Sequence, residues 1–133
     1  MQVNVYNNLD FPVTIGNITI KVGHNYLPIE IWASYSDSPE VAELVENGSF
    51  LINCYQAYRV FENSVDEIKY IDFDNVQSLE KLEYFKKKYD ANIILCDIYK
   101  EQFKNTHAGK EFVKLNLKAI EKAYADKAKE LIT

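Results

Sequence analysis

The chain has 133 residues, enough for one domain that buries a hydrophobic core without disulfides. It has two cysteines, no basic and apolar leader and no run of about 18 apolar residues, which argues against a disulfide scaffold, secretion and a membrane span. Residues 1–63 hold two cations and seven acids, whereas residues 64–133 hold 13 of each sign. An acidic first half and a single arginine suit phosphate backbones poorly, so we expect no nucleic-acid partner.

Short β-branched segments dominate the first half of the sequence. Residues 1–6 alternate between apolar and polar side chains, which predicts a half-buried strand. The segments VTI and ITI flank Gly16, where a glycine-asparagine pair favours a tight hairpin turn. Residues 23–25 read as a further turn, and Pro28 indicates that residues 26–32 form an edge strand or irregular structure.

The stretch from Ser36 to Cys54 gives the clearest local signals. Ser38 is a suitable N-cap and Pro39 fits the first helical position, while Gly48 is suited to a left-handed stop. One face between them is apolar and comprises Val41, Ala42, Leu44 and Val45. The pattern predicts a two-turn helix that packs on a following strand, Phe50 to Cys54.

The middle of the chain is harder to interpret. Residues 57–61 and 68–73 are candidate strands. Asp74 is a candidate cap for a helix over residues 76–89, where Val76, Leu79, Leu82, Phe85 and Tyr89 recur every three or four positions. Residues 91–104 place Ile94, Leu95, Ile98, Tyr99 and Phe103 on one helical face, but IILCDIY also fits a buried strand. The length of the segment favours a helix.

The end of the chain predicts one long helix. Thr106 can cap it, and no proline or late glycine interrupts residues 108–133. Apolar residues recur there at spacings close to a coiled-coil stripe, and a helix of this length overhangs a small domain. We therefore predict an interface with a neighbouring subunit formed by Phe112, Val113, Leu117, Ile120, Tyr124 and Leu131.

The candidate chemical groups do not form a recognisable site in the sequence. Pairs of Cys54 with His24 or of Cys96 with His107 could be imagined, but no nucleophile motif surrounds either cysteine, and buried thiols with surface histidines are the better interpretation. The acidic segment at residues 72–75 lacks the glycine and glutamate of a calcium loop. Nearby acids neutralise the lysines at 86–88. We expect no catalytic residue, no metal and no cofactor.

One segment resembles a known class of protein. Residues 12–54 combine a hairpin around a glycine (VTIGNITIKVG), a short capped helix (EVAELVENG) and a strand (SFLIN). This order resembles a small β-rich module of tailed-bacteriophage virion proteins, found in neck, tail and fibre components. The resemblance implies a structural subunit of the neck, head-tail connector or tail. Its partners would be copies of itself and other virion proteins, in a particle assembled in the host cytoplasm.

Together these patterns predict an α+β protein. A small antiparallel β-rich half with one embedded short helix spans residues 1–73, and a helical half ending in a long helix spans residues 74–133. We expect a non-enzymatic, homo-oligomeric subunit with no membrane partner and no small-molecule substrate. The alternative is an acidic cytoplasmic binding module, such as an inhibitor or antitoxin, that recognises a basic partner.

Overall fold

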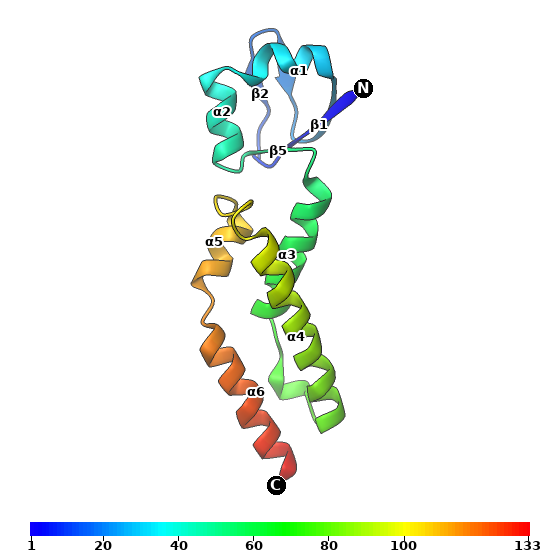
Figure 1. The fold of residues 1–133 in the computed structure, drawn as a ribbon, viewed down its shortest axis with the longest axis vertical. Coiled ribbons are helices and arrows are strands. Elements are labelled where there is room, and N and C mark those ends of the chain that lie inside the picture. Colours follow the sequence, from blue (N-terminus) through cyan, green and yellow to red (C-terminus); the bar gives the residue numbers. More distant parts are fainter. The chain divides into compact units, whose positions relative to one another are not determined.

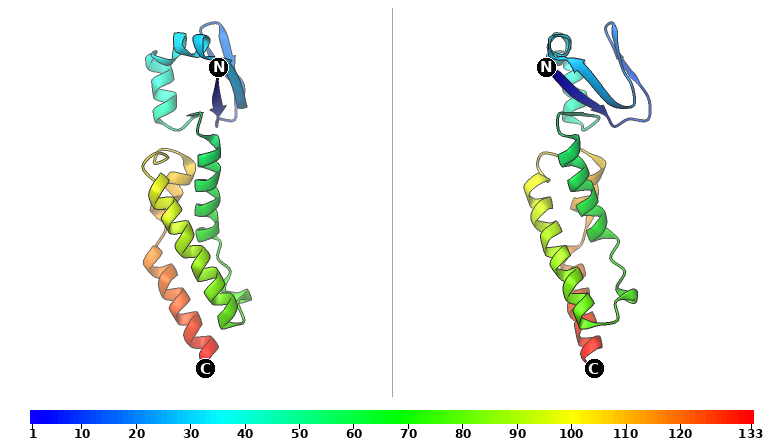
Figure 2. Two further views of the ribbon diagram at one scale, coloured as in Figure 1. Left: turned by 45° about the vertical axis from the view of Figure 1, so that its right-hand side comes forward. Right: turned by 90° about the vertical axis from the view of Figure 1, so that its right-hand side faces the viewer.

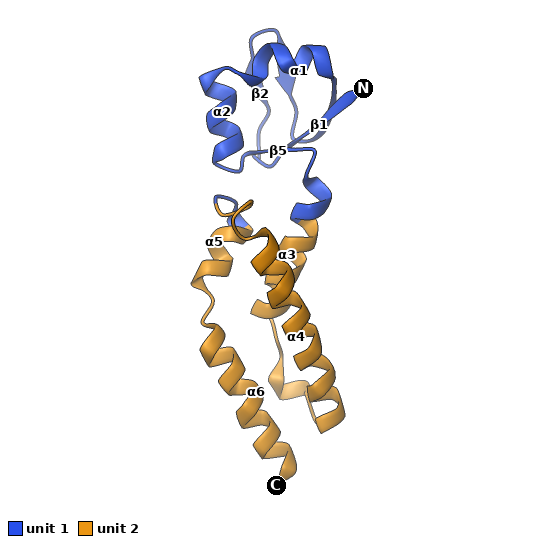
Figure 3. Cartoon of the chain, in the orientation of Figure 1, with its two compact units in different colours: residues 1–58, 105–107 blue, residues 59–104, 108–133 orange.

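The computed structural model describes residues 1–133 and confirms the α+β class, with antiparallel strands first and helices after them (Figure 1). The chain forms two compact units (Figure 3). Unit 1 comprises Met1–Tyr58 and Asn105–His107, and unit 2 comprises Arg59–Lys104 and Ala108–Thr133.

Unit 1 is built on a three-stranded antiparallel sheet with the order β4-β1-β5. Its strands are β1 (Gln2–Asn7), β4 (Gly23–Pro28) and β5 (Phe50–Ile52). A second, two-stranded sheet pairs β2 (Val13–Ile15) with β3 (Ile18–Ile20). The hairpin turns at Gly16, whose φ of 58° is easily reached by glycine, as the sequence predicted.

Two short helices complete unit 1. Helix α2 (Pro39–Glu46) begins and ends as predicted, because Ser38 Oγ accepts from the Val41 amide at 3.3 Å and Gly48 has a φ of 81°. Helix α1 (Ile29–Ser36) was not predicted. Pro28 ends edge strand β4 and occupies the N-cap position of α1, so the segment after Pro28 is helix rather than edge strand.

The core of unit 1 lies between the strands and these helices. It contains Val3, Val5, Ile15, Ile20, Trp32, Val41 and Phe50. Two buried asparagines fix the loops around it. Asn7 Nδ2 donates to the Ile20 carbonyl at 3.2 Å, and Asn25 Nδ2 donates to the Lys21 carbonyl at 2.8 Å. These side chains satisfy loop backbone groups that the strands leave unpaired.

The strands predicted at residues 57–61 and 68–73 are wrong. Helix α3 (Tyr55–Lys69) runs through the first segment and into the second, followed by the short 3-10 helix η1 (Phe73–Asn75). The buried residues Tyr58, Phe61, Val65 and Ile68 recur every three or four positions, which is helical spacing. The last strand of the chain therefore ends at Ile52.

Unit 2 is helical, and its longest element is α4 (Leu79–Tyr99) (Figure 2). Asp74 is not its cap. The cap is Ser78, four residues after Asp74, whose Oγ accepts from the Lys81 amide at 3.2 Å. Residues 91–99 continue the same helix, which resolves the choice between helix and strand in favour of helix. The two separately predicted helical segments are thus one element.

The predicted terminal helix is interrupted. Helix α5 (His107–Lys114) begins directly after Thr106. Two residues separate it from α6 (Leu117–Ile132). Asn116 Oδ1 accepts from the Ala119 amide at 3.1 Å, so this asparagine caps α6 instead of continuing α5. A Cβ on Gly109 would lie 2.1 Å from the Phe103 carbonyl oxygen, so only glycine lets α5 approach that backbone.

Candidate interaction site

Five of the six predicted interface residues are buried or half-buried within unit 2. Val113 is 79% exposed, whereas Phe112, Leu117, Ile120 and Leu131 are half-buried and Tyr124 is buried. The ring of Phe112 meets that of Phe61 edge to face, with their centroids 6.3 Å apart. Within one chain, unit 2 therefore already covers most of the apolar stripe on α5 and α6.

Tyr124 shows how α6 is held against its own unit. Its ring packs edge to face on Phe73, at 4.8 Å between centroids, and lies 5.5 Å from the ring of Tyr89. Its hydroxyl donates to the Phe85 carbonyl at 3.3 Å. Aromatic packing of this kind stabilises a core, and it joins α6 to η1 and α4.

Helix α4 carries apolar residues on two opposite faces. Its inward face contains the buried residues Leu82, Tyr89, Asn92 and Cys96. Its opposite face contains Tyr84, Lys87, Ala91, Ile94 and Ile98, all exposed, and we call these five residues the outward stripe. Their successive spacings of three and four residues place them in one row along a helix.

The outward stripe is unusually apolar for an exposed surface. Tyr84 is 59% exposed, Ile94 62% and Ile98 64%. In the right-hand view of Figure 2, α4 forms one edge of unit 2, with α3 on its other side. An apolar row that its own unit leaves uncovered is typical of a protein contact surface.

The sequence analysis missed this stripe because it divided α4 into two helices. Each segment was assigned one apolar face, and Ile94 and Ile98 were grouped with Phe103. In the continuous helix, Ile94 and Ile98 lie opposite Leu82 and Tyr89. The signal available in the sequence was the spacing of three and four residues that links Tyr84, Lys87, Ala91, Ile94 and Ile98.

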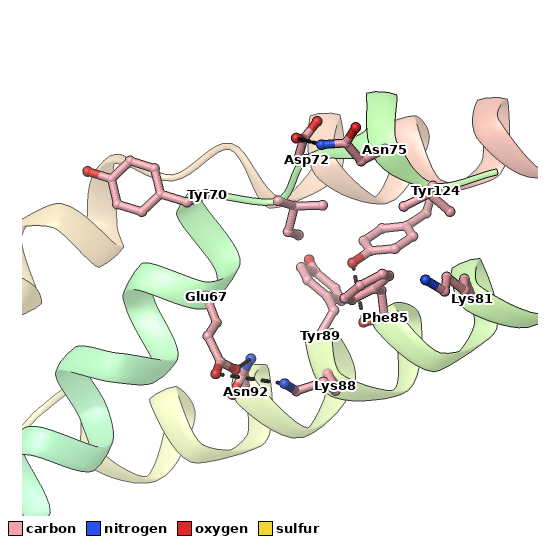
Figure 4. A pocket seen from close by; sticks show the side chains of 12 residues that line it. Glu67, Tyr70, Asp72, Asn75, Lys81, Phe85, Lys88, Tyr89, Asn92 and Tyr124 are labelled. Atoms are coloured by element: carbon pink, nitrogen blue, oxygen red, sulfur yellow. Dashed lines mark hydrogen bonds and ion pairs between the residues drawn. The ribbon is translucent and has the colours of Figure 1, made fainter.

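A cavity of about 420 Å³ lies in unit 2 where residues of α3, α4 and α6 meet (Figure 4). The aromatic rings of Phe85, Tyr89 and Tyr124 line one side of it. Its polar groups bind one another: Asn92 Nδ2 donates to Glu67 Oε2 at 2.8 Å, and Lys88 Nζ lies 3.9 Å from Glu67 Oε1. The hydrogen bond between Asn92 and Glu67 joins α3 to α4, which is a structural role, whereas the 3.9 Å approach of Lys88 to Glu67 is a long ion pair.

Two titratable groups on the inward face of α4 hold their protons strongly. Burial raises the pKa of Tyr89 to about 12, and the negative charges of Glu121 and Asp90 add to this rise. Burial also raises the pKa of Cys96 to about 11, with a contribution from Asp97. At neutral pH Cys96 is therefore a thiol rather than a thiolate, so it is not an activated nucleophile.

The remaining candidate groups are occupied by local contacts. The imidazole of His24 meets the ring of Tyr55 edge to face, with 4.4 Å between centroids, and its Nδ1 lies 3.2 Å from Asn4 Nδ2. Cys54 is half-buried, and neither cysteine is in a disulfide. Asp72 accepts a short hydrogen bond from Asn75.

The lysine cluster is dispersed around α4. Lys86 Nζ pairs with Asp90 Oδ1 at 2.7 Å, Lys88 faces Glu67, and Lys87 lies in the outward stripe. Three cations that point in different directions do not form a continuous basic surface. His107 is exposed at the start of α5.

The chain contains no cluster of three or more histidine, cysteine, aspartate or glutamate residues able to hold a metal ion. None of its helices combines the length and apolar character needed to cross a membrane. No family model matches the chain, and no curated protein or solved structure is significantly similar to it.

Proposed function

We propose that this chain is a non-enzymatic structural subunit that self-associates through the outward stripe of α4, in the neck, head-tail connector or tail of a bacteriophage particle. The observation that carries self-association is the exposure of Ile94 and Ile98, at 62% and 64%, on a helix whose opposite face is already buried. Contact with another helix would remove these side chains from water. Burial of apolar surface drives most protein association.

The assignment to a phage particle depends on the resemblance of residues 12–54. The sequence quoted for the resemblance corresponds to the hairpin β2–β3, the capped helix α2 and the strand β5, with β4 and α1 between the hairpin and α2. The two supports are independent. Self-association concerns α4 in unit 2, whereas the resemblance concerns unit 1.

The first experiment is light scattering of the full chain from about 10 μM to 1 mM, at low and at high salt. We expect an oligomer that persists at high salt, because apolar contacts are not screened by ions. The double substitution Ile94→Asp with Ile98→Asp should give a monomer that remains folded, since both side chains are exposed. Val113→Asp on α5 is the control, because Val113 is 79% exposed, more than either isoleucine, and lies outside the stripe.

A monomer at every concentration would contradict the proposal and favour the acidic binding module, whose contact with a basic partner would weaken steeply with salt. The particle assignment has its own test. Mass spectrometry of purified particles of the encoding phage should detect the chain in stoichiometric amount. Its absence from purified particles would exclude the virion role while leaving self-association intact.

A further inference from the structure

We infer that the outward stripe binds the same stripe of a second copy with the two α4 helices parallel; this inference rests on the proposed self-association. The stripe follows a heptad pattern with Tyr84, Ala91 and Ile98 at one core position and Lys87 and Ile94 at the other. It extends over about 21 Å of helix. The orientation follows from the charges beside it.

The two flanks of the stripe carry opposite charges. On one side of the stripe lie the residues that directly precede Tyr84, Ala91 and Ile98. These are Glu83, Asp90 and Asp97, and we call them the acidic flank. On the other side lie Lys81, Lys88 and Leu95, each seven residues from the next. We call the two lysines the basic flank. All five charged residues are exposed.

Only one orientation brings opposite flanks together. When two helices pair in parallel around a two-fold axis, the acidic flank of one faces the basic flank of the other. Glu83 then lies within reach of Lys88 of the second copy, and symmetry repeats this pair. In the antiparallel orientation the acidic flanks face each other, and like charges disfavour that arrangement.

The two paired residues are available for this contact. Glu83 forms no ion pair within its own chain, and the only ion pair of Lys88 is the 3.9 Å approach to Glu67. Asp90 and Asp97 are instead paired locally, with Lys86 at 2.7 Å and Lys100 at 3.1 Å. The charge pattern therefore fits a second copy of this chain rather than a uniformly basic or acidic partner.

The contact should be weak on its own. Its apolar residues occupy about two heptads, so it buries less area than a stable interface of about 1,600 Å², and we expect dissociation constants in the micromolar range or above. Such a contact suits a particle in which other interfaces hold the subunits close together.

Charge reversal tests the orientation. At low salt, Glu83→Lys should weaken self-association about tenfold, because both intermolecular pairs become repulsive. Lys88→Glu should act in the same direction, and an equimolar mixture of the two variants should associate as strongly as the unaltered chain. Glu43→Lys on α2 makes the same charge change away from the stripe and should have no effect. Denaturant unfolding of each variant checks that the fold is intact.

The outcomes separate this inference from the proposed function. Stronger association of Glu83→Lys would indicate antiparallel helices, and no change would indicate that the flanks are outside the contact; either result overturns the parallel pairing. If Ile94→Asp with Ile98→Asp still abolishes the oligomer in those cases, the proposed function stands. If the chain never self-associates, or if the isoleucine substitutions leave its self-association unchanged, both the parallel pairing and the proposed function are overturned.

Discussion

The stripes on α4 and on α5–α6 have nearly the same spacing in the sequence but different surroundings in the fold. In the stripe on the terminal helices, Tyr124 packs on Phe73 of η1 and on Tyr89 of α4, and it is 4% exposed. All five residues of the outward stripe of α4 are exposed, and Ile94 is 62% exposed. Apolar periodicity thus identifies a helical face, but it does not identify what covers that face.

The comparison changes where an intermolecular contact is expected. The sequence placed it on the last helix, because a long uninterrupted helix with an apolar stripe suggested an overhang. In the structure that helix is shorter, and it contributes to its own core. The uncovered apolar surface belongs to α4, which carries apolar residues both on its buried inward face and on its exposed outward stripe.

The largest difference between the stripes should appear in stability. Tyr124→Ala should lower the free energy of unfolding by about 3–5 kcal/mol, because it removes a buried ring that packs on Phe73 and Tyr89. Ile98→Ala on the outward stripe should change it by less than about 0.5 kcal/mol, since the side chain is already exposed. Urea unfolding monitored by circular dichroism, with the chain dilute enough to be monomeric, measures both values.

Tyr124→Phe is the matched control for the ring. It keeps the aromatic packing and removes only the hydrogen bond to the Phe85 carbonyl, so we expect a loss of about 1 kcal/mol. Equal losses for Tyr124→Ala and Ile98→Ala would contradict the distinction between a covered and an uncovered stripe.

The inward face of α4 should also make stability depend on alkaline pH. The pKa of Cys96 is raised from 9.0 to about 11, and that of Tyr89 is raised from 10.0 to about 12. Both groups bind their protons more strongly in the folded chain than in the unfolded one. The stabilisation is therefore complete below pH about 9 and is lost as the pH rises through the folded-state values.

Urea midpoints measured between pH 8 and pH 12 check this dependence, with Cys96→Ala and Tyr89→Phe as comparisons. Each substitution should flatten its part of the alkaline decline. At pH 7, Tyr89→Phe should be neutral or slightly stabilising, because the buried Tyr89 hydroxyl has no hydrogen-bond partner. An unchanged alkaline slope in both variants would show that other groups cause the decline.

The interruption between α5 and α6 provides a smaller effect. Asn116→Ala should cost about 1 kcal/mol, because it removes the side chain that accepts from the Ala119 amide. Asn116→Ser or Asn116→Asp can replace that acceptor and should retain most of the stability. If Asn116→Ala were stabilising instead, the chain would favour the continuous terminal helix that the sequence predicted.

In unit 1, the sequence was sufficient to predict those turns and helix ends that are determined by residues close together in the chain. Ser38 and Gly48 gave the limits of α2, and Gly16 gave the hairpin. The sequence failed where packing decides the structure. Residues 57–61 have side chains that suit a strand, but Phe61 is fully buried at helical spacing from Tyr58 and Val65, and this burial cannot be read from propensity.

The candidate site was missed for a related reason. An asparagine can continue a helix or cap one, and the choice at Asn116 determined how the terminal stripe is divided. Likewise, Asp74 and Ser78 are both acceptable caps, and only Ser78 leaves room for η1 and the buried Val76 before α4 begins. The outward stripe itself was hidden by the predicted break between residues 89 and 91, whereas α4 continues through Asp90.

An effect on association rather than on stability concerns Lys87, the one charged residue within the outward stripe. In a parallel pair its two copies would face each other across the two-fold axis, where like charges oppose association. Lys87→Leu should therefore strengthen self-association about fivefold, which corresponds to roughly 1 kcal/mol. The free energy of unfolding of the monomer should change by less than about 0.5 kcal/mol, because the side chain is exposed. Sedimentation equilibrium measures the first quantity and urea unfolding the second, with Lys118→Leu on α6 as a control outside the stripe. Equal strengthening by both leucine substitutions would indicate nonspecific hydrophobic association, whereas an effect confined to Lys87→Leu would place the contact on the outward stripe.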